Sequence, residues 1–172
     1  MDIDLGREAE IQYELYHILR EVVGSGLGRE INGYQVTKVI PEVSADDGRA
    51  DLVVVGKQKD RYGEDKLLVI EVKRRATRDV RPYKTGTKKA WAYAKSLNAR
   101  YFAVCDGWFM LLFRSYGVFI GAYEVEWSFS YATNLLRALV TGCFGDLPKH
   151  RDKTLIEQRL IPLLTGIGIS LT

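Results

Sequence analysis

The sequence predicts an α/β fold in which helices flank a central sheet. Apolar residues recur at helical spacing near the start of the chain, and three strand-like runs rich in Val, Leu and Ile follow. A second helical pattern then precedes further strand-like runs. The 172 residues are enough for a substantial core, and they contain no linker, repeat or low-complexity block. We therefore expect a single domain that spans residues 1–172.

The first helix is expected over residues 6–23, where one face is apolar. A Gly-rich segment at residues 24–28 ends the pattern, and a first strand is expected over residues 34–43. The apolar stripe of the helix consists of Ile11, Leu15, Ile18, Leu19 and Val22.

A long-looped hairpin is the central feature of the sequence. Two strand-like runs, residues 48–55 and 67–73, are separated by a polar, turn-forming segment. If the hairpin is symmetrical about Arg61, Asp51 falls opposite Glu71. The register therefore predicts that two carboxylates face each other.

The surroundings of these carboxylates point to a cation. Strand side chains alternate between two faces, so Val69, Glu71 and Lys73 share one face, and both faces of this strand are apolar. Like charges directly opposite each other destabilise a sheet, and a buried carboxylate without a partner takes up a proton. Taken singly, Asp51 could be a strand-start residue and Glu71 with Lys73 a plain ion pair. Taken together they favour a metal site, with Mg²⁺ or Mn²⁺ as the ion that suits hard oxygen ligands.

This arrangement resembles the signature of the PD-(D/E)xK nuclease superfamily. Asp51, nineteen intervening residues and then Glu71-Val72-Lys73 carry the resemblance. The superfamily includes restriction endonucleases, archaeal Holliday-junction resolvases and the nuclease domains of type I restriction motor subunits. The resemblance spans about residues 6–114 and implies a restriction-endonuclease-like αβββαβ core, with a mixed central sheet flanked by helices. A C-terminal β-hairpin and helical extension over residues 115–172 would complete the fold.

The resemblance also implies roles for individual residues. Asp51, Glu71 and the carbonyl of Val72 would hold Mg²⁺ or Mn²⁺, with Glu8 of the first helix assisting directly or through water. Lys73 would orient or activate the attacking water. The implied function is metal-dependent hydrolysis of DNA phosphodiester bonds, with products that carry a 5′-phosphate.

Other acids compete for the role of Glu8. Glu10 and Glu14 lie on the same expected helix and are rivals for it. Glu42, at the end of the strand before Asp51, could be an extra ligand or a solvated loop acid.

The segment from Lys73 to Arg100 is strongly basic. It holds ten Lys or Arg and one acid, which gives a net charge of +9, while the rest of the chain carries −6. A one-sided basic segment beside a proposed metal site is typical of proteins that bind a polyanion. We expect a loop through Thr87 and then a helix over residues 88–98. The predicted nucleic-acid contacts are Arg74, Arg75, Arg78, Arg81, Lys84, Lys88, Lys89 and Tyr93.

Two positions of this helix have alternative interpretations. Lys89 and Tyr93 resemble a Gln-x-x-x-Tyr pair of related nucleases, with Lys in the place of Gln, so Lys89 could grip a phosphate. Tyr93 could instead belong to the core. Trp91 could stack on a base, or pack within the chain or against another subunit.

Strands are expected at residues 100–105, 108–113 and 118–125, and two helical patterns follow. The apolar tail at residues 166–172 would cover a sheet edge or a partner subunit.

Composition narrows the function classes. With two His and two distant Cys, a zinc site is not expected, and the thiols indicate a reducing, cytoplasmic compartment. The sequence shows no signal peptide, membrane span or nucleotide-binding loop. The expected partner is DNA, with a homodimer or a larger complex with a separate motor or specificity chain as options. The alternatives are a non-cleaving DNA-binding or assembly module and an RNA-directed nuclease.

Overall fold

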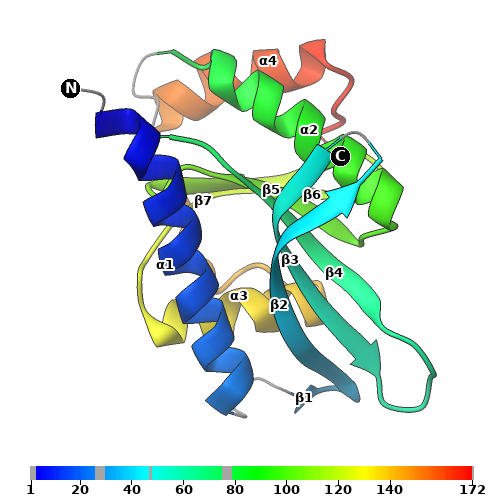
Figure 1. The fold of residues 1–172 in the computed structure, drawn as a ribbon. Coiled ribbons are helices and arrows are strands. Elements are labelled where there is room, and N and C mark those ends of the chain that lie inside the picture. The colour runs from blue at the N-terminus through cyan, green and yellow to red at the C-terminus, as the bar shows by residue number, and fades with distance from the viewer. Residues whose placement is uncertain (1–2, 26–29, 47, 75–78, 172) are drawn as a thin grey trace.

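A seven-stranded mixed sheet forms the centre of the computed structural model, which describes residues 3–25, 30–46, 48–74 and 79–171 (Figure 1). The strands lie in the sheet in chain order, and neighbours are antiparallel except β4 and β5, which are parallel and joined through α2. The strands are β1 (Glu30–Ile31), β2 (Tyr34–Ala45), β3 (Gly48–Gln58), β4 (Asp65–Val72), β5 (Tyr101–Cys105), β6 (Phe109–Arg114) and β7 (Val118–Glu124). The helices are α1 (Ile3–Ser25), α2 (Arg81–Leu97), α3 (Phe129–Thr141), the π-helical turn η1 (Leu155–Leu160) and α4 (Ile161–Gly166).

Helices cover both faces of the sheet, as the apolar residues on both faces of β4 predict. Helices α1 and α3 pack on one face, and α2, η1 and α4 pack on the other (Figure 1). In β4, Ile70 belongs to the first core and Val69 to the second, so alternate side chains of one strand serve both layers. The fold is therefore α/β with a mixed central sheet between helices, as expected.

The hairpin of β3 and β4 has the register that the sequence predicts near the site. Leu52 lies opposite Ile70, so the next pair along the strands is Asp51 and Glu71. A bulge between Val54 and Val55 shifts the pairing on the side toward the loop. The bulge does not change the pairing at the other end of the hairpin, where Asp51 and Glu71 lie.

Helix α2 begins at Arg81, and the prediction of a loop through Thr87 was wrong. Pro82 occupies the first turn, where a missing N–H is tolerated. The carboxylate of Asp79 accepts the backbone N–H of Arg81 at 3.0 Å, which supports the start of the helix. Gly86, a weak helix former, is retained in the interior because the helix approaches the sheet closely there.

The segment after residue 114 is built into the same two cores. Leu135 of α3 joins the core under α1, and Leu160 of η1 joins the core under α2. Ser170 pairs with β7 through backbone hydrogen bonds with Gly117 and Phe119, both at 2.8 Å. Of the two roles left open for the apolar tail, the structure shows that it covers a sheet edge.

Among the described residues, no helix has both the length and the apolar composition needed to cross a bilayer.

Candidate active site

The acid pair lies where β3 separates from β4. The ladder between the two strands stops at Leu52 and Ile70, and beyond it Oδ2 of Asp51 accepts the backbone N–H of Val72 at 2.7 Å. A side chain thus replaces a backbone acceptor at this point of the ladder. This hydrogen bond fixes the Asp51 carboxylate beside the end of β4.

Burial makes the charge of this pair costly. Glu71 is 6% exposed, and burial, followed by the nearby charge of Asp51, raises its pKa to about 8. The cations Lys73 and Lys89 oppose this rise in the pKa of Glu71. The pKa of Asp51 is also raised, mainly by burial, against the opposing effect of the Val72 N–H. The two carboxyls resist being ionised together without further positive charge.

Lys73 supplies only part of that charge. Its Nζ lies 3.7 Å from Oε1 of Glu71, and its side chain is 16% exposed. Its backbone N–H donates to the carbonyl of Cys105 at 2.8 Å, and its aliphatic stem packs beside Gly86 of α2. With both carboxyls ionised, the buried Oε2 of Glu71 has no hydrogen-bond donor among the described residues.

The residues present fit a hard divalent cation. Within one strand residue the N–H and C=O point to the same neighbour, so the Val72 carbonyl faces β3 and Asp51, as its N–H does. Two carboxylates and a carbonyl suit Mg²⁺, which usually keeps several of its waters. In the part of the chain that the structure describes, no group of three or more acidic, His or Cys side chains could hold a metal ion. A cation at the acid pair would rely on Asp51, Glu71 and the Val72 carbonyl.

Helix α1 reaches the site through Gln12, a residue that the sequence patterns did not single out. Its Nε2 donates to the carbonyl of Asp51 and to Oε1 of Glu42, both at 2.9 Å. Glu8 lies one turn earlier and is half-buried, and the hydrogen bonds of the described residues link α1 to Asp51 through Gln12. Gln12 carries no charge, so a pattern of acidic residues does not reveal it. Its spacing of four residues from Glu8 places both side chains on the same face of α1.

The rival acids of α1 lie at a hollow next to Asp106. Glu10 and Glu14 line a surface hollow together with Asp106, Trp108 and Trp127.

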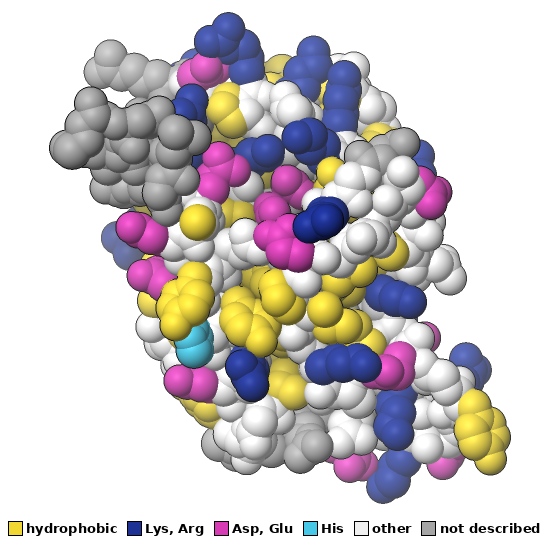
Figure 2. All heavy atoms as spheres, in the orientation of Figure 1, with side chains coloured by type: hydrophobic (Ala, Val, Ile, Leu, Met, Phe, Trp, Pro, Cys, Tyr) yellow, Lys and Arg dark blue, Asp and Glu magenta, His cyan; other side chains and the backbone are white. Residues whose placement is uncertain are grey.

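Helix α2 carries exposed basic side chains, and the charge of one of them, Lys89, acts on Glu71. Lys84, Lys88 and Lys89 are exposed on that helix, and Arg74 is exposed after β4, whereas residues 75–78, with Arg75 and Arg78, lie outside the described residues. Figure 2 shows Lys and Arg side chains gathered on the part of this face that α2 occupies, next to a group of acidic side chains.

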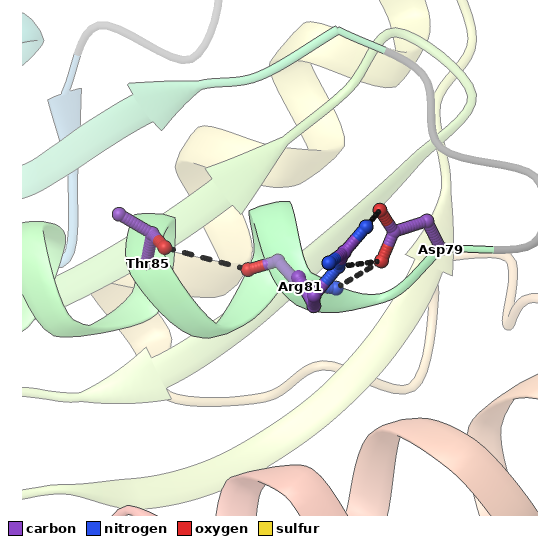
Figure 3. Close-up of polar contacts among 3 residues, drawn as sticks. All are labelled: Asp79, Arg81 and Thr85. Atoms are coloured by element: carbon purple, nitrogen blue, oxygen red, sulfur yellow. Dashed lines mark hydrogen bonds and ion pairs between the residues drawn. The ribbon is translucent and has the colours of Figure 1, made fainter.

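Arg81 is already engaged within the chain. Its guanidinium binds both carboxylate oxygens of Asp79, with distances of 2.8–3.1 Å (Figure 3). The hydroxyl of Thr85 donates to the Arg81 carbonyl one turn later. The pairing lowers the pKa of Asp79 to about 2, and it offsets part of the charge that Arg81 would offer a phosphate.

Trp91 and Tyr93 of α2 both have contacts within the protein. Tyr93 is buried, and its hydroxyl lies over Gly48 at the tip of the β2–β3 hairpin. Trp91 stacks on Phe102 and donates its Nε1–H to the carbonyl of Ser115 at 3.1 Å. These contacts agree with the packing alternatives named for each residue.

Asp106, a buried carboxylate outside the acid pair, links α2 to the strands beside the site. It is buried, accepts the N–H groups of Trp108 and Phe109 at 2.9 Å each, and is hydrogen-bonded by the hydroxyl of Tyr83 on α2. From the sequence, Asp106 was expected only as part of a turn. Its bonds tie the first turn of α2 to the end of β5, directly beside Lys73.

The architecture described above is restriction-endonuclease-like. Among solved structures, the chain is similar to the type IIG restriction endonuclease BpuSI, with a TM-score of 0.52 and 18% sequence identity. The similarity covers 77% of this chain and 17% of that one, and at this identity it shows the fold alone. No family model and no curated protein matches the chain.

Proposed function

We propose that this protein is a metal-dependent nuclease that hydrolyses DNA phosphodiester bonds. The observation that carries the proposal is the pair of half-buried Asp51 and buried Glu71 beside Lys73, at the open end of two strands. Burial raises the pKa of both carboxyls, and the charge of Asp51 adds to this rise for Glu71, which is the arrangement that a bound divalent cation relieves. The likeness to a restriction endonuclease in fold supports the same class of protein.

Each residue has a role that its position supports. Asp51, Glu71 and the Val72 carbonyl would hold Mg²⁺ or Mn²⁺, which when bound would polarise the phosphate and lower the pKa of a coordinated water. Lys73, beside Glu71, would donate a hydrogen bond to the attacking water and stabilise the charge that develops on the phosphate. Attack by water on phosphorus with departure of the 3′ oxygen would leave a 5′-phosphate.

The exposed lysines of α2 would hold the backbone of the nucleic acid. The charge of Lys89 acts on Glu71, so a phosphate bound by Lys89 would lie near the acid pair, and Lys84 and Lys88 would extend the contact along the exposed side of the same helix. Because the chain aligns with 17% of BpuSI, we further propose that another polypeptide segment or a separate chain supplies target selection.

A cleavage assay tests this proposal. The purified protein would be incubated with supercoiled, linear, single-stranded and branched DNA, and with RNA, in Mg²⁺, Mn²⁺ or EDTA. We expect metal-dependent cutting that falls by a factor of about 10²–10³ in Asp51→Asn and in Lys73→Ala, as for the loss of one electrostatic group in an active site. Asn at position 51 can still accept the Val72 N–H, so the variant keeps the local hydrogen bond.

Asp60→Asn, a change to an exposed acid in the β3–β4 loop, is the matched control and should cut like the unaltered protein. Cutting that persists in EDTA or in Asp51→Asn would exclude this mechanism. Salt-sensitive DNA binding without cutting would favour the non-cleaving module, and cutting confined to RNA would change the substrate.

A further inference from the structure

We propose that Glu42 is a third acid of the candidate metal site and that Gln12 positions it. Glu42 would act on the cation through a water molecule, from the solvent side of the acid pair. This inference rests on the proposed function, because it requires a cation at Asp51 and Glu71.

The strand register brings Glu42 into line with the acid pair. In the pairing of β2 with β3, Pro41 lies opposite Leu52 and Val43 lies opposite Ala50, so Glu42 falls opposite Asp51. Asp51 in turn falls opposite Glu71 on its other side. The three acids therefore occupy one row across three adjacent strands, and the negative charge of Glu42 acts on Asp51.

The backbone of Glu42 adopts a conformation that is uncommon for its residue type. Its φ is +55°, in the left-handed region that residues other than Gly, Asn and Asp seldom occupy. Such a conformation persists only where its surroundings hold it in place. Here the contact with Gln12 is part of what holds it.

Gln12 fixes the direction of the Glu42 carboxylate without cancelling its charge. The two hydrogens of its amide nitrogen serve Oε1 of Glu42 and the carbonyl of Asp51, which ties the carboxylate to the strand that carries the other acid. A Lys or Arg in this place would neutralise the carboxylate, whereas an amide leaves its charge available to a cation. Only Oε1 is bound by Gln12, so Oε2 can accept a hydrogen bond from a water that the cation holds.

An independent observation indicates that a ligand belongs beside this row. Glu71 is more than nine-tenths buried, and its Oε2 lacks a hydrogen-bond donor among the described residues. A buried acceptor of this kind is normally satisfied by a donor or an ion. A cation held by the acid pair would satisfy Oε2 of Glu71, and Glu42 would act on that cation through a water molecule.

The test measures Mn²⁺ binding to the full chain by isothermal titration calorimetry, without nucleic acid. We expect Glu42→Gln to weaken Mn²⁺ binding by about tenfold, the lower range for loss of an outer-shell partner. Gln12→Leu, which removes the donor without altering charge, should weaken it about threefold. Glu64→Gln, at an exposed acid paired with Lys38 at the other end of the hairpin, should stay within twofold.

Thermal unfolding without metal establishes that each variant is folded, and the Mn²⁺-induced rise in Tm gives a second measure of affinity. If Asp51→Asn loses Mn²⁺ binding while Glu42→Gln behaves like Glu64→Gln, the role of Glu42 is refuted and the metal site stands. A larger loss in Glu8→Gln than in Glu42→Gln also refutes it. If Asp51→Asn binds Mn²⁺ normally, the proposed metal site fails and this inference fails with it.

Discussion

At the scale of single residues, the acid pair makes the stability of the protein depend on pH. Burial raises the pKa of Glu71 from an ordinary value of 4.5 to about 8, so the folded chain without metal keeps a proton that the unfolded chain releases in this interval. Stability falls with rising pH wherever the folded state binds more protons. The raised pKa of Asp51 acts in the same direction.

We therefore expect the Tm of the metal-free protein to fall between about pH 5 and pH 8. Glu71→Gln should remove most of this slope, because Gln carries no ionisable proton and fills nearly the same volume. Mg²⁺ should raise the Tm more at pH 8 than at pH 6, since the ionised carboxyls bind it. Scanning calorimetry in EDTA and in Mg²⁺ at several pH values measures both effects.

Glu64→Gln is the matched control for this pH experiment. The pKa of Glu64 is lowered, chiefly by its hydrogen bond with Lys38, so the stability linked to it is lost only at acidic pH, outside the window set by Glu71. Glu64→Gln should therefore keep the wild-type slope between pH 5 and 8. A slope that survives in Glu71→Gln would show that other groups cause it.

The sequence could predict that Glu71 and Lys73 share a face and that Asp51 lies opposite Glu71. It could not predict the role of Gln12. Alternation along β4 places Glu71 and Lys73 on one face, and turn symmetry places Asp51 opposite Glu71, so local patterns alone bring these residues together. The role of Gln12 depends on how α1 docks against the ends of β2 and β3. Such docking is a tertiary property, and a neutral amide carries no charge signature to reveal it.

At the scale of elements, the packing of α2 against β4 positions the catalytic candidate Lys73. A Cβ on Gly86 would lie 3.2 Å from Cγ and Cε of Lys73 and from Cγ1 of Val104. The absence of a side chain at position 86 thus allows the Lys73 stem to pass between the helix and the sheet. The hydrogen bond from Tyr83 to Asp106 holds the same end of the helix against β5.

We expect Gly86→Ala to separate stability from activity. The better helix propensity of Ala, about 1 kcal/mol, offsets the crowding, so the free energy of unfolding should change by less than about 1 kcal/mol. Cleavage should fall about tenfold, because Lys73 must shift by a few tenths of an ångström. Urea unfolding and the cleavage assay give the two readings.

Gly24→Ala is the control for Gly86→Ala, because Gly24 lies in α1 with open space where its Cβ would be. It should raise stability without altering cleavage. Equal cleavage by the two variants would mean that the packing of the Lys73 stem does not set the rate.

The start of α2 shows why element boundaries were harder to predict than element order. The sequence from Thr77 to Thr87 contains Pro and Gly, which normally interrupt helices. Pro82 instead falls in the first turn, and Gly86 leaves room for the close approach of Lys73. Asp79 before Pro82 was the available signal for an earlier start.

At the scale of the whole molecule, the order of helices and strands was predictable because each has its own apolar period. The sheet, with helices on both faces, follows from that order and from the apolar residues on both sides of β4. The position of the tail could not be predicted, since an apolar segment fits a sheet edge or a partner equally well. The backbone hydrogen bonds of Ser170 with Gly117 and Phe119 place the tail at the edge of the sheet, and they join residues about fifty positions apart in the sequence.

The uneven charge of the molecule leads to a prediction about binding. The segment from Lys73 to Arg100, which contains α2, carries a net charge of +9 against −6 for the rest of the chain, and Lys84 and Lys88 are exposed one turn apart on that helix. If they contact phosphates, replacing both by Gln should weaken DNA binding about equally for all sequences. The slope of log K against log salt concentration should become shallower by about 0.9 for each phosphate that is no longer neutralised.

A matched pair distinguishes this effect from a loss of overall charge. Lys57 and Arg61 are exposed at the loop end of the β3–β4 hairpin, and Lys57 lies six residues, roughly 20 Å of strand, from Asp51. Lys57→Gln with Arg61→Gln removes the same charge but should leave the salt slope unchanged. Fluorescence anisotropy of labelled duplex DNA in metal-free buffer at several salt concentrations measures the slopes. Equal slopes for the two double variants would mean that α2 is not the surface that holds the phosphates, and that the acid pair meets its substrate from another side.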